Sequence, residues 1–454
     1  MSRIFWFRKD LRLQDNEALT QCAEAAVADG DSQVLGCFTY QKNSFENLSG
    51  IRQHSLVASI ESLDSAIKNS LNVLEGDGAD ALAKFATKND VEYVHATESF
   101  DPTGISEQQS VAKALAAIGK TLVLTGSNYA VKPGSVNKPT DGSAYRVYTP
   151  FYKAWFDIGW PEPFKLPSRV IWNKASQDQI PKPTKPAKFK IRAGEKFALE
   201  TFERFKDRAL FDYSDNRNRA DLSGTSRLSH ALAHGEIHPR TLLADLRDTP
   251  SHNVFRKEIA WREFYADVLF RNPHTLNDYY VPRYSQMRYD TGKQADQKLE
   301  RWKQGTTGFP MVDAGMRQLA NEGWMHNRVR MIVASFLVKD LHLEWQVGAE
   351  WFENCLSDFD PASNSHGWQW TAGCGTDASP YYRVFNPILQ GYKFDPDGNY
   401  VRKYIPELSH LQGAEVHEPW LLVDGLINGY PEPMLDHSKE RDESLRRLEE
   451  IKEK

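Results

Sequence analysis

Hydrophobic positions along the first 130 residues follow two different spacings. Short runs rich in β-branched and aromatic residues predict strands at 3–7, 33–40, 71–76, 91–97 and 121–126. The segments between them have helical periodicity, as in the apolar stripe formed by Leu56, Ile60, Leu63 and Ile67. Strands that alternate with helices predict a doubly wound parallel sheet, a fold that binds ligands at the carboxyl ends of its strands.

The pattern changes after this first domain. Residues 161–192 contain six prolines, eight lysines or arginines and two acids, which is typical of a stiff connection running over the surface. From about residue 195 the periodicity is helical throughout, ending in a charged amphipathic helix. The sequence therefore predicts an α/β domain at 1–130, a long interdomain linker at 131–195 and an all-helical domain at 196–454.

Composition narrows the class of protein. With 454 residues, 40% hydrophobic and 26% charged, the chain is globular. Its net charge of −5 excludes a generally basic surface but leaves room for a local basic patch. The four cysteines have no CxxC spacing, so we expect neither a disulfide framework nor a metal site. With neither a signal peptide nor an apolar stretch of membrane-spanning length, we expect a cytoplasmic protein.

No common nucleotide signature is present, since neither GxGxxG nor GxxxxGK[ST] occurs. The segment GTSRLS at 224–229 instead places hydroxyls and a guanidinium where a glycine loop turns into a helix. Backbone N–H groups at a helix start, with such side chains, can bind phosphate. The commoner alternative is that a Ser or Thr side chain caps the helix.

Two predicted helices have faces that mix acids, amides and aromatic rings. The first face carries Glu258, Trp261, Arg262 and Tyr265, spaced i, i+3, i+4 and i+7. The second, within GWMHNRVRM, carries Asn327, Arg330 and Met331. Each face is a candidate site, and interhelical ion pairing with aromatic packing is an equally good explanation of the first. Met331 alone would more often be core packing.

The segment DFDPASNSHGWQW at 358–370 holds two aspartates, an asparagine, a histidine and two tryptophans. This mixture is typical neither of a core helix nor of an ordinary loop. The segment is therefore a candidate site.

Long motifs in this chain resemble the photolyase/cryptochrome family. They are WFRKDLRLQDN, YRVYTPFYKAW, GTSRLS, AWREFY, TGFPMVDAGMRQL, GWMHNRVRM, WQWTAGCGTDASPYYRVFNP and VHEPW, in order from residue 3 to about 440. Among the branches, the chain looks most like a cyclobutane pyrimidine dimer photolyase. The resemblance implies an α/β domain able to hold an antenna chromophore and a helical domain that binds FAD.

The resemblance also implies which residues surround the flavin. Asp358 and Asp360 match aspartates that hold the ribityl and ring region, and Asn364 matches the asparagine facing flavin N5. Trp368 and Trp345 match the inner and middle members of an electron-transfer chain. The other matching positions around FAD are Tyr213, Thr225, Ser226, Arg227, Leu228, Ser229, Phe255, Arg262, Trp324, Asn327 and Arg330.

For the substrate, the resemblance implies UV-damaged DNA from which the dimer is flipped out, because a photolyase cannot reach its target inside a duplex. Trp261 and Trp370 match indoles that pack against the flipped dimer, and Glu258 would hydrogen-bond its base edge. The positions matching further substrate contacts are Arg217, Asn327 and Met331. Excited, reduced FAD would supply one electron to split the dimer. We expect a monomer that does not bind membranes.

The chain departs from the family pattern at three places. No outer tryptophan of the electron-transfer chain is evident at 284–302, so either Tyr289 replaces it or the path leaves elsewhere. An Arg-Asp pair is replaced by Arg217-Asn218. The segment SFDPTGISEQQSV lacks a folate-type Asn-Glu pattern, leaving a deazaflavin, a flavin, a folate or no antenna open. The alternative function is a cryptochrome-type blue-light receptor, which Met331 and Asn364 disfavour.

Overall fold

The computed structural model describes residues 2–166, 170–188, 191–377 and 382–452. Residues 378–381 of the WQWTAGCGTDASPYYRVFNP motif and parts of the predicted linker lie outside these ranges. By packing, the chain divides into two compact units. The first comprises Met1–Phe211 and Ser226–Pro273, and the second comprises Asp212–Thr225 and His274–Lys454.

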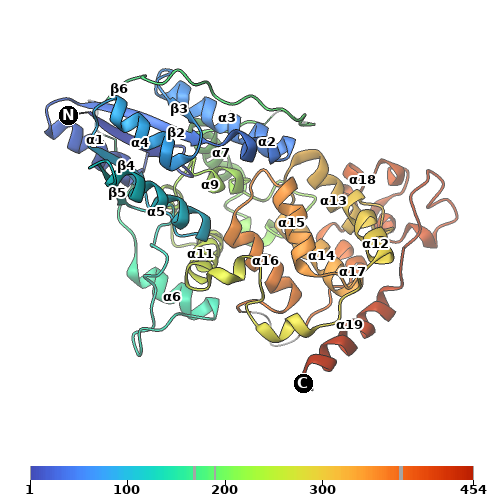
Figure 1. Ribbon diagram of the computed structural model, residues 1–454. Coiled ribbons are helices and arrows are strands. Elements are labelled where there is room, and N and C mark those ends of the chain that lie inside the picture. Colours follow the sequence, from blue (N-terminus) through green and yellow to red (C-terminus); the bar gives the residue numbers. More distant parts are fainter. Residues whose placement is uncertain (1, 167–169, 189–190, 378–381, 453–454) are drawn as a thin grey trace. The chain divides into compact units, whose positions relative to one another are not determined.

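A parallel sheet forms the centre of the first unit (Figure 1). Its strands run in the order β3-β2-β1-β4-β5, the doubly wound arrangement that the sequence predicted. Their bounds are β1 Arg3–Phe7, β2 Gln33–Tyr40, β3 Asn72–Glu75, β4 Tyr93–Thr97 and β5 Thr121–Thr125. Each lies within one of the five predicted ranges, so both the strands and the topology are confirmed.

Alternating side chains of the sheet build two apolar layers. Along β1, Phe5 and Phe7 pack with helices α1 (Glu17–Ala28) and α3 (Gly50–Ala66), whereas Ile4 and Trp6 pack with α4 (Gly78–Lys88) and α5 (Pro102–Ala116). Successive residues of a strand point to opposite faces, so each face receives its own pair of helices. The sheet is therefore buried on both sides.

The segment predicted as a linker contains structure of its own. Helix α6 (Tyr148–Ile158) packs on α11 (Pro250–Arg271), and a short strand, β6 (Ile171–Trp172), pairs in parallel with β2. Packing thus assigns both this segment and the stretch around α11 to the first unit, a division that differs from the predicted boundaries at 130 and 195. As functional boundaries, those two positions stay predictions.

Asp15 fastens the helix-rich stretch after residue 226 to the rest of the first unit. Its carboxylate pairs with Arg240 at 2.9 Å and accepts hydrogen bonds from the Thr241 hydroxyl at 3.0 Å and the Phe164 N–H at 3.1 Å. Burial opposes its ionisation, but contacts with His238 and Arg240 outweigh this and lower its pKa to about 2. The buried carboxylate is therefore ionised at neutral pH.

The other helices of the first unit are short or lie at its periphery. Their bounds are α2 Lys42–Asn47, α7 Glu195–Arg208, α9 Ser229–Ala233 and α10 Pro239–Ala244.

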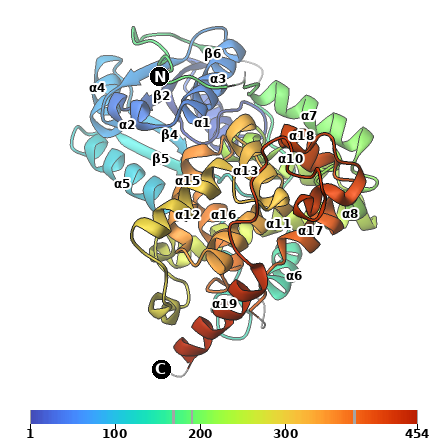
Figure 2. The same ribbon diagram turned by 90° about the vertical axis from the view of Figure 1, so that its right-hand side faces the viewer.

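The second unit is built from helices, as predicted for the chain after residue 195. They are α8 Tyr213–Asn216, α12 Lys293–Gln304, α13 Pro310–Glu322, α14 Asn327–Ser335, α15 Trp345–Cys355, α16 Pro361–Ala372, α17 Pro387–Phe394, α18 Asn399–Tyr404 and α19 His437–Lys452. In Figure 2, α12, α13, α15 and α16 lie together in the middle of this unit. A π-helical turn, Phe336–Asp340, continues α14.

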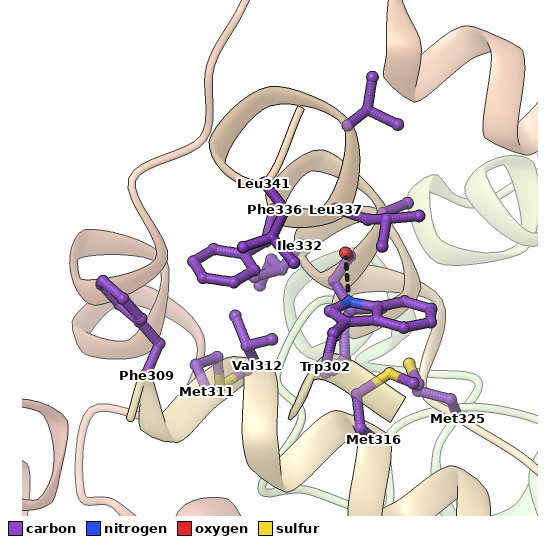
Figure 3. Packing of buried hydrophobic residues seen from close by; sticks show 14 of the residues in the cluster. Trp302, Phe309, Met311, Val312, Met316, Met325, Ile332, Phe336, Leu337 and Leu341 are labelled. Carbon is purple, nitrogen blue, oxygen red and sulfur yellow. Dashed lines mark hydrogen bonds between the residues drawn. The ribbon is translucent and has the colours of Figure 1, made fainter. Parts of the chain in front are cut away.

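Trp302 is the centre of the apolar core in the second unit. Its indole is fully buried, and its N–H donates to the Val333 carbonyl oxygen at 3.0 Å. Figure 3 shows the indole between Met316, Met325 and the side chains of the following helices, with this hydrogen bond dashed. A buried indole with its one donor satisfied can serve as a large packing centre without an energetic penalty.

The cysteines are free thiols, and most of them are buried. Cys22, Cys37 and Cys374 are buried and Cys355 is half-buried, all four as free thiols. Burial raises the pKa of each, to about 11 for Cys355. In the described part of the chain, no helix is long and apolar enough to cross a membrane, and no cluster of ligating side chains suits a metal ion.

We expect Asp15→Asn to lower the free energy of unfolding by about 2 kcal/mol at pH 7, because the amide cannot replace the ionised partner of Arg240. A carboxyl group whose pKa is lowered in the folded protein stabilises the fold at pH values above its pKa in the unfolded chain. This stabilisation is lost as the pH falls towards the folded-state pKa. The difference between wild type and variant should therefore shrink from about pH 4 towards pH 2. Denaturant titrations at several pH values measure it, and a pH-independent difference would contradict the role of the charge.

Candidate functional site

The candidate site in the second unit is built around an ion pair between α14 and the segment before α16. The Arg330 guanidinium donates to Oδ2 of Asp358 at 2.7 Å, and its Nε donates to the Met325 carbonyl oxygen at 2.8 Å. The Asp358 side chain is fully buried. Two residues predicted to bind FAD are thus brought into contact, and the arginine is held in place from two sides.

Asp360 and Asn364 have different roles at the start of α16. Asp360 is the N-cap, accepting a hydrogen bond from the Ser363 N–H at 2.7 Å. The Asn364 amide instead donates to the Ala349 carbonyl oxygen on α15 at 3.0 Å. Because Nδ2 is used in this bond, the orientation of the amide is fixed, which fits a positioned hydrogen-bonding group. Capping of α16 is thus the task of Asp360, not of Asn364.

Trp368 lies against a glycine of the neighbouring helix. A Cβ on Gly348 of α15 would come within 2.1 Å of the Trp368 ring, so only glycine permits this approach of α15 and α16. Trp368 also meets Phe352 edge-on at 5.0 Å between ring centroids. Trp345, the first residue of α15, is likewise buried. Neither indole N–H has a hydrogen-bond partner among the described residues.

Two features of the second unit fit an absent polar ligand such as the flavin. Oδ1 of Asp358 is buried and has no hydrogen-bond partner in the described part of the chain, a costly arrangement unless a ligand donates to it. On α16, a Cβ at Gly367 would meet no atom within 4 Å, so open space lies next to the helix between Asn364 and Trp368. An acceptor without a partner and open space are thus present where the resemblance places FAD.

The remaining predicted residues of this unit lie on three separate segments. Tyr213 is buried on α8, and the Arg217 guanidinium lies 5.9 Å from its ring centroid. Asn327 and Met331 occupy one face of α14, as predicted, with Trp324 on the turn before it. The indole of Trp370 donates to the Asp377 carbonyl oxygen at 3.1 Å, which orients it at the end of α16.

Asn218 compensates in part for the departure from the Arg-Asp pattern. Its side-chain oxygen accepts two hydrogen bonds from Arg328 on α14, at 2.9 and 3.2 Å. The neighbouring Arg219 is paired with Asp221 at 2.6 Å. Arg219 therefore offers little unpaired charge for a local basic patch.

In the first unit, helix α11 carries the predicted face with Glu258, Trp261 and Arg262. Trp261 stacks on Tyr148 of α6, with ring centroids 3.7 Å apart and planes within 8°. The Tyr148 hydroxyl donates to the Lys257 carbonyl oxygen at 2.6 Å, which locks this ring in place. The Tyr148 ring thus covers one face of the Trp261 indole and fixes its orientation. The sequence predicted no role for Tyr148.

Arg262 has a structural task beside any contact with the cofactor. Its guanidinium donates to the carbonyl oxygens of Asn128 at 3.1 Å and Leu232 at 3.2 Å, and lies 4.6 Å from the Tyr129 ring centroid. Phe255, also predicted near FAD, is buried and packs against Phe205 of α7. The structure thus explains both residues in part by packing, and their contact with FAD stays a prediction.

The GTSRLS segment is not an ordinary helix cap. Helix α9 begins at Ser229 with Leu228 as N-cap and no side-chain capping bond, and the Ser226 hydroxyl accepts from the Leu228 N–H at 3.4 Å. Arg227 adopts a left-handed backbone conformation, φ 56°. Thr225 belongs to the second unit and Ser226 to the first. The capping alternative is wrong, and phosphate binding here stays a prediction.

A pocket of about 740 Å³ opens at the carboxyl ends of β2 and β3, where a doubly wound sheet binds ligands. It is lined by Thr39, Tyr40, Gln41, Ser44, Gly76, Asp77, Gly78, Ala79, Pro102, Thr103, Ser106, Glu107 and Ser110. Five of these come from the SFDPTGISEQQSV segment considered for the antenna. Glu107, whose pKa burial raises, lies 3.7 Å from Arg8.

Comparison with known proteins defines the family. Residues 3–168 match the DNA photolyase family, and residues 255–450 match the FAD binding domain of DNA photolyase. The chain therefore belongs to the DNA photolyase family. Deoxyribodipyrimidine photo-lyase from Agrobacterium fabrum is 38% identical to it, over 97% of this chain and 96% of the relative. The predicted family and the FAD-binding helical part are confirmed.

Three solved structures have the same fold as this protein over nearly its full length. A bacterial class III photolyase from Agrobacterium tumefaciens has a TM-score of 0.88 at 35% identity, covering 100% of this chain and 98% of its own. An archaeal photolyase from Sulfolobus tokodaii with two FAD molecules has a TM-score of 0.84 at 26% identity, covering 99% and 100%. A cryptochrome from Synechocystis has a TM-score of 0.88 at 25% identity, covering 98% of each chain.

Some residues of the site were not predicted from the sequence. Tyr148 packs on the α11 face, and Glu263 of α11 is fully buried, accepting hydrogen bonds from the Val131 N–H at 3.0 Å and the Trp155 indole at 2.6 Å. Tyr148 lies in the family motif YRVYTPFYKAW, so the sequence could have identified it as a site residue. Glu263 adjoins Arg262 in the sequence, and there was no pattern to mark it as buried.

We expect Gly348→Ala to lower the free energy of unfolding by about 1–3 kcal/mol, because its Cβ would overlap the Trp368 ring. Gly367→Ala on α16 is the matched control, since its Cβ meets nothing within 4 Å and alanine favours a helix by about 0.5–1 kcal/mol. Denaturant titration of the flavin-free proteins compares them. Equal stabilities of the two variants would contradict the close approach of α15 and α16.

Proposed function

We propose that the protein repairs cyclobutane pyrimidine dimers in UV-damaged DNA, driven by light and dependent on FAD. The observation that carries this proposal is the match of residues 255–450 to the FAD binding domain of DNA photolyase, together with a deoxyribodipyrimidine photo-lyase 38% identical over nearly the whole chain. The cryptochrome relative is less similar, at 25% identity. Light signalling is therefore the second candidate.

The residues divide the work between cofactor and substrate. Asp358 and Arg330 would bind the flavin, Asp358 through its unpartnered Oδ1, and Asn364 would offer its amide to the ring. When bound and reduced, the flavin supplies on excitation the electron that splits the dimer. The protein contributes orientation and exclusion of water, and neither a nucleophile nor a metal ion enters the proposed reaction.

Trp261 and Trp370 would replace the stacking that a flipped dimer loses. The Trp261 indole is backed by the Tyr148 ring, and Trp370 is held through its N–H on Asp377. Rigid aromatic surfaces of this kind contribute about 1–3 kcal/mol per stacked base. Glu258, on the same helix face as Trp261, would hydrogen-bond the base edge, and Arg217 and Met331 would line the substrate side.

The pocket beside β2 and β3 is the proposed site of a second, antenna chromophore. Its size suits a fused heterocycle, and its lining is rich in hydroxyls. The candidate chromophores are a deazaflavin, a flavin and a folate. A monomer is sufficient for the proposed reaction, and a cytoplasmic location stays a prediction from sequence.

Illumination of the chemically reduced, flavin-loaded protein should restore thymine in an oligonucleotide containing a thymine dimer, with no repair in the dark. Trp261→Ala should weaken binding of that oligonucleotide by about 5- to 150-fold, the equivalent of one lost stacking platform. Trp160→Ala, which removes another indole of the first unit packed on Trp155, is the control. Absence of repair by a protein that binds FAD would exclude the proposed enzyme and favour signalling.

Asn364→Asp should impair repair by the chemically reduced protein more strongly than it impairs folding. Loss of the donor to Ala349 costs about 1 kcal/mol of stability, whereas a carboxylate beside the flavin opposes its negatively charged reduced state. Asn364→Ala lacks the same hydrogen bond without adding charge, so it separates the two effects. Repair rates and unfolding midpoints of both variants measure them. Equal repair by the two variants would contradict the electrostatic role.

A further inference from the structure

The buried indole of Trp345 touches a tyrosine for which the sequence predicted no role. Tyr279 meets it edge-on, with ring centroids 6.2 Å apart. Trp345 is 1% exposed and Tyr279 is 3% exposed, so the contact is shielded from water. Tyr289, the candidate proposed from sequence, interacts with the Tyr279 phenol, and among the described residues the ring contact with Trp345 is made by Tyr279.

The Tyr279 hydroxyl is connected to a base at the surface. It donates to Oε1 of Glu344 at 2.9 Å, and the Glu344 side chain is exposed. Glu344 is the N-cap residue of α15 but makes no side-chain capping bond, so its carboxylate is available to the phenol. Burial raises the pKa of Tyr279, so the phenol keeps its proton at neutral pH.

Gln369 holds the backbone around Tyr279 in place. Fully buried between Trp368 and Trp370, it donates to the carbonyl oxygens of Thr275 at 2.9 Å and Asp278 at 3.1 Å, and accepts from the Tyr280 N–H at 2.7 Å. The tyrosine is thereby tied to the helix that carries the inner indole.

Trp302 also contacts Trp368, but it is not suited to be the terminal electron donor. Trp302 meets Trp368 edge-on at 6.2 Å, but it is fully buried and its N–H is bonded to the Val333 carbonyl oxygen. A backbone carbonyl cannot take a proton. An oxidised Trp302 would therefore stay a buried cation, which the low-dielectric core disfavours.

We propose that Tyr279 is the terminal electron donor of the tryptophan chain and that Glu344 accepts its proton. This inference rests on the proposed function. The oxidant is the Trp345 radical cation, formed when Trp345 gives an electron through Trp368 to the light-excited oxidised flavin. One electron passes from Tyr279 to Trp345 and the phenolic proton passes to Oε1 of Glu344.

The products balance this step. Trp345 returns to its neutral, closed-shell state, Tyr279 becomes a neutral phenoxyl radical and Glu344 becomes a carboxylic acid. Because Glu344 is exposed, its proton exchanges with solvent, so the positive charge leaves the core. Tyr289 keeps its own proton and acts as a positioning residue beside Tyr279.

The test uses the full-length protein loaded with oxidised FAD, and three variants. Tyr279→Phe removes the phenol. Glu344→Gln keeps an acceptor for its hydrogen bond but cannot take its proton. Tyr289→Phe, the matched control, keeps both Tyr279 and Glu344. Time-resolved electron paramagnetic resonance and absorption after a light flash, in H2O and D2O, identify the radical and its rate of formation.

Wild type should form a tyrosyl radical, more slowly in D2O than in H2O, and Tyr289→Phe should retain it. Tyr279→Phe and Glu344→Gln should lose the tyrosyl signal and show only an indole radical. A tyrosyl signal that persists in Tyr279→Phe, or a Glu344→Gln protein matching wild type in both solvents, would overturn the proposal. Dimer repair by chemically reduced wild type, which needs no electron from Tyr279, tests the proposed function separately.

Discussion

The close approach of α15 and α16 at Gly348 is the constraint on which the candidate site of the second unit depends. The Trp368 ring occupies the space that a side chain at Gly348 would need. The Asn364 amide bonds to the carbonyl oxygen of Ala349, the next residue along α15. One helix contact therefore sets both the inner indole and the amide predicted to face the flavin, and small shifts there would misplace both at once.

Polar groups in this protein are buried where they join segments that are distant in the sequence. Asp15 holds residues beyond 226, and Glu263 holds the backbone at 130–131. Asp313 in the second unit accepts hydrogen bonds from Thr307 and Gly308 and from the Tyr430 hydroxyl. Each of these carboxyl groups makes several hydrogen bonds, as a buried polar group must. Asp358 differs from these three in having one oxygen without a partner among the described residues, and it pairs with Arg330, which is why we propose it as a ligand contact.

Periodicity predicted the elements of this fold well because burial follows it closely. The apolar runs predicted as strands and the stripe on α3 reappear in the apolar layers on the two faces of the sheet. Contacts over long sequence separations could not be predicted in the same way. Tyr279 and Glu344 are 65 positions apart, and nothing in the local pattern relates them. Likewise, Asp360 and Asn364 are both residue types that cap helices, and only the structure separates the cap from the positioned amide.

The burial of the cysteines makes thiol modification a probe of local unfolding in this protein. Three thiols are inside the two cores and the fourth is half-covered, and each keeps its proton well above neutral pH. Since the thiolate is the reactive form, a thiol-specific reagent finds few targets in the folded protein. Cys22 and Cys37 are in the first unit, whereas Cys355 and Cys374 are in the second. The rate at which each cysteine is modified would therefore report local opening of the unit that contains it, separately for the two units.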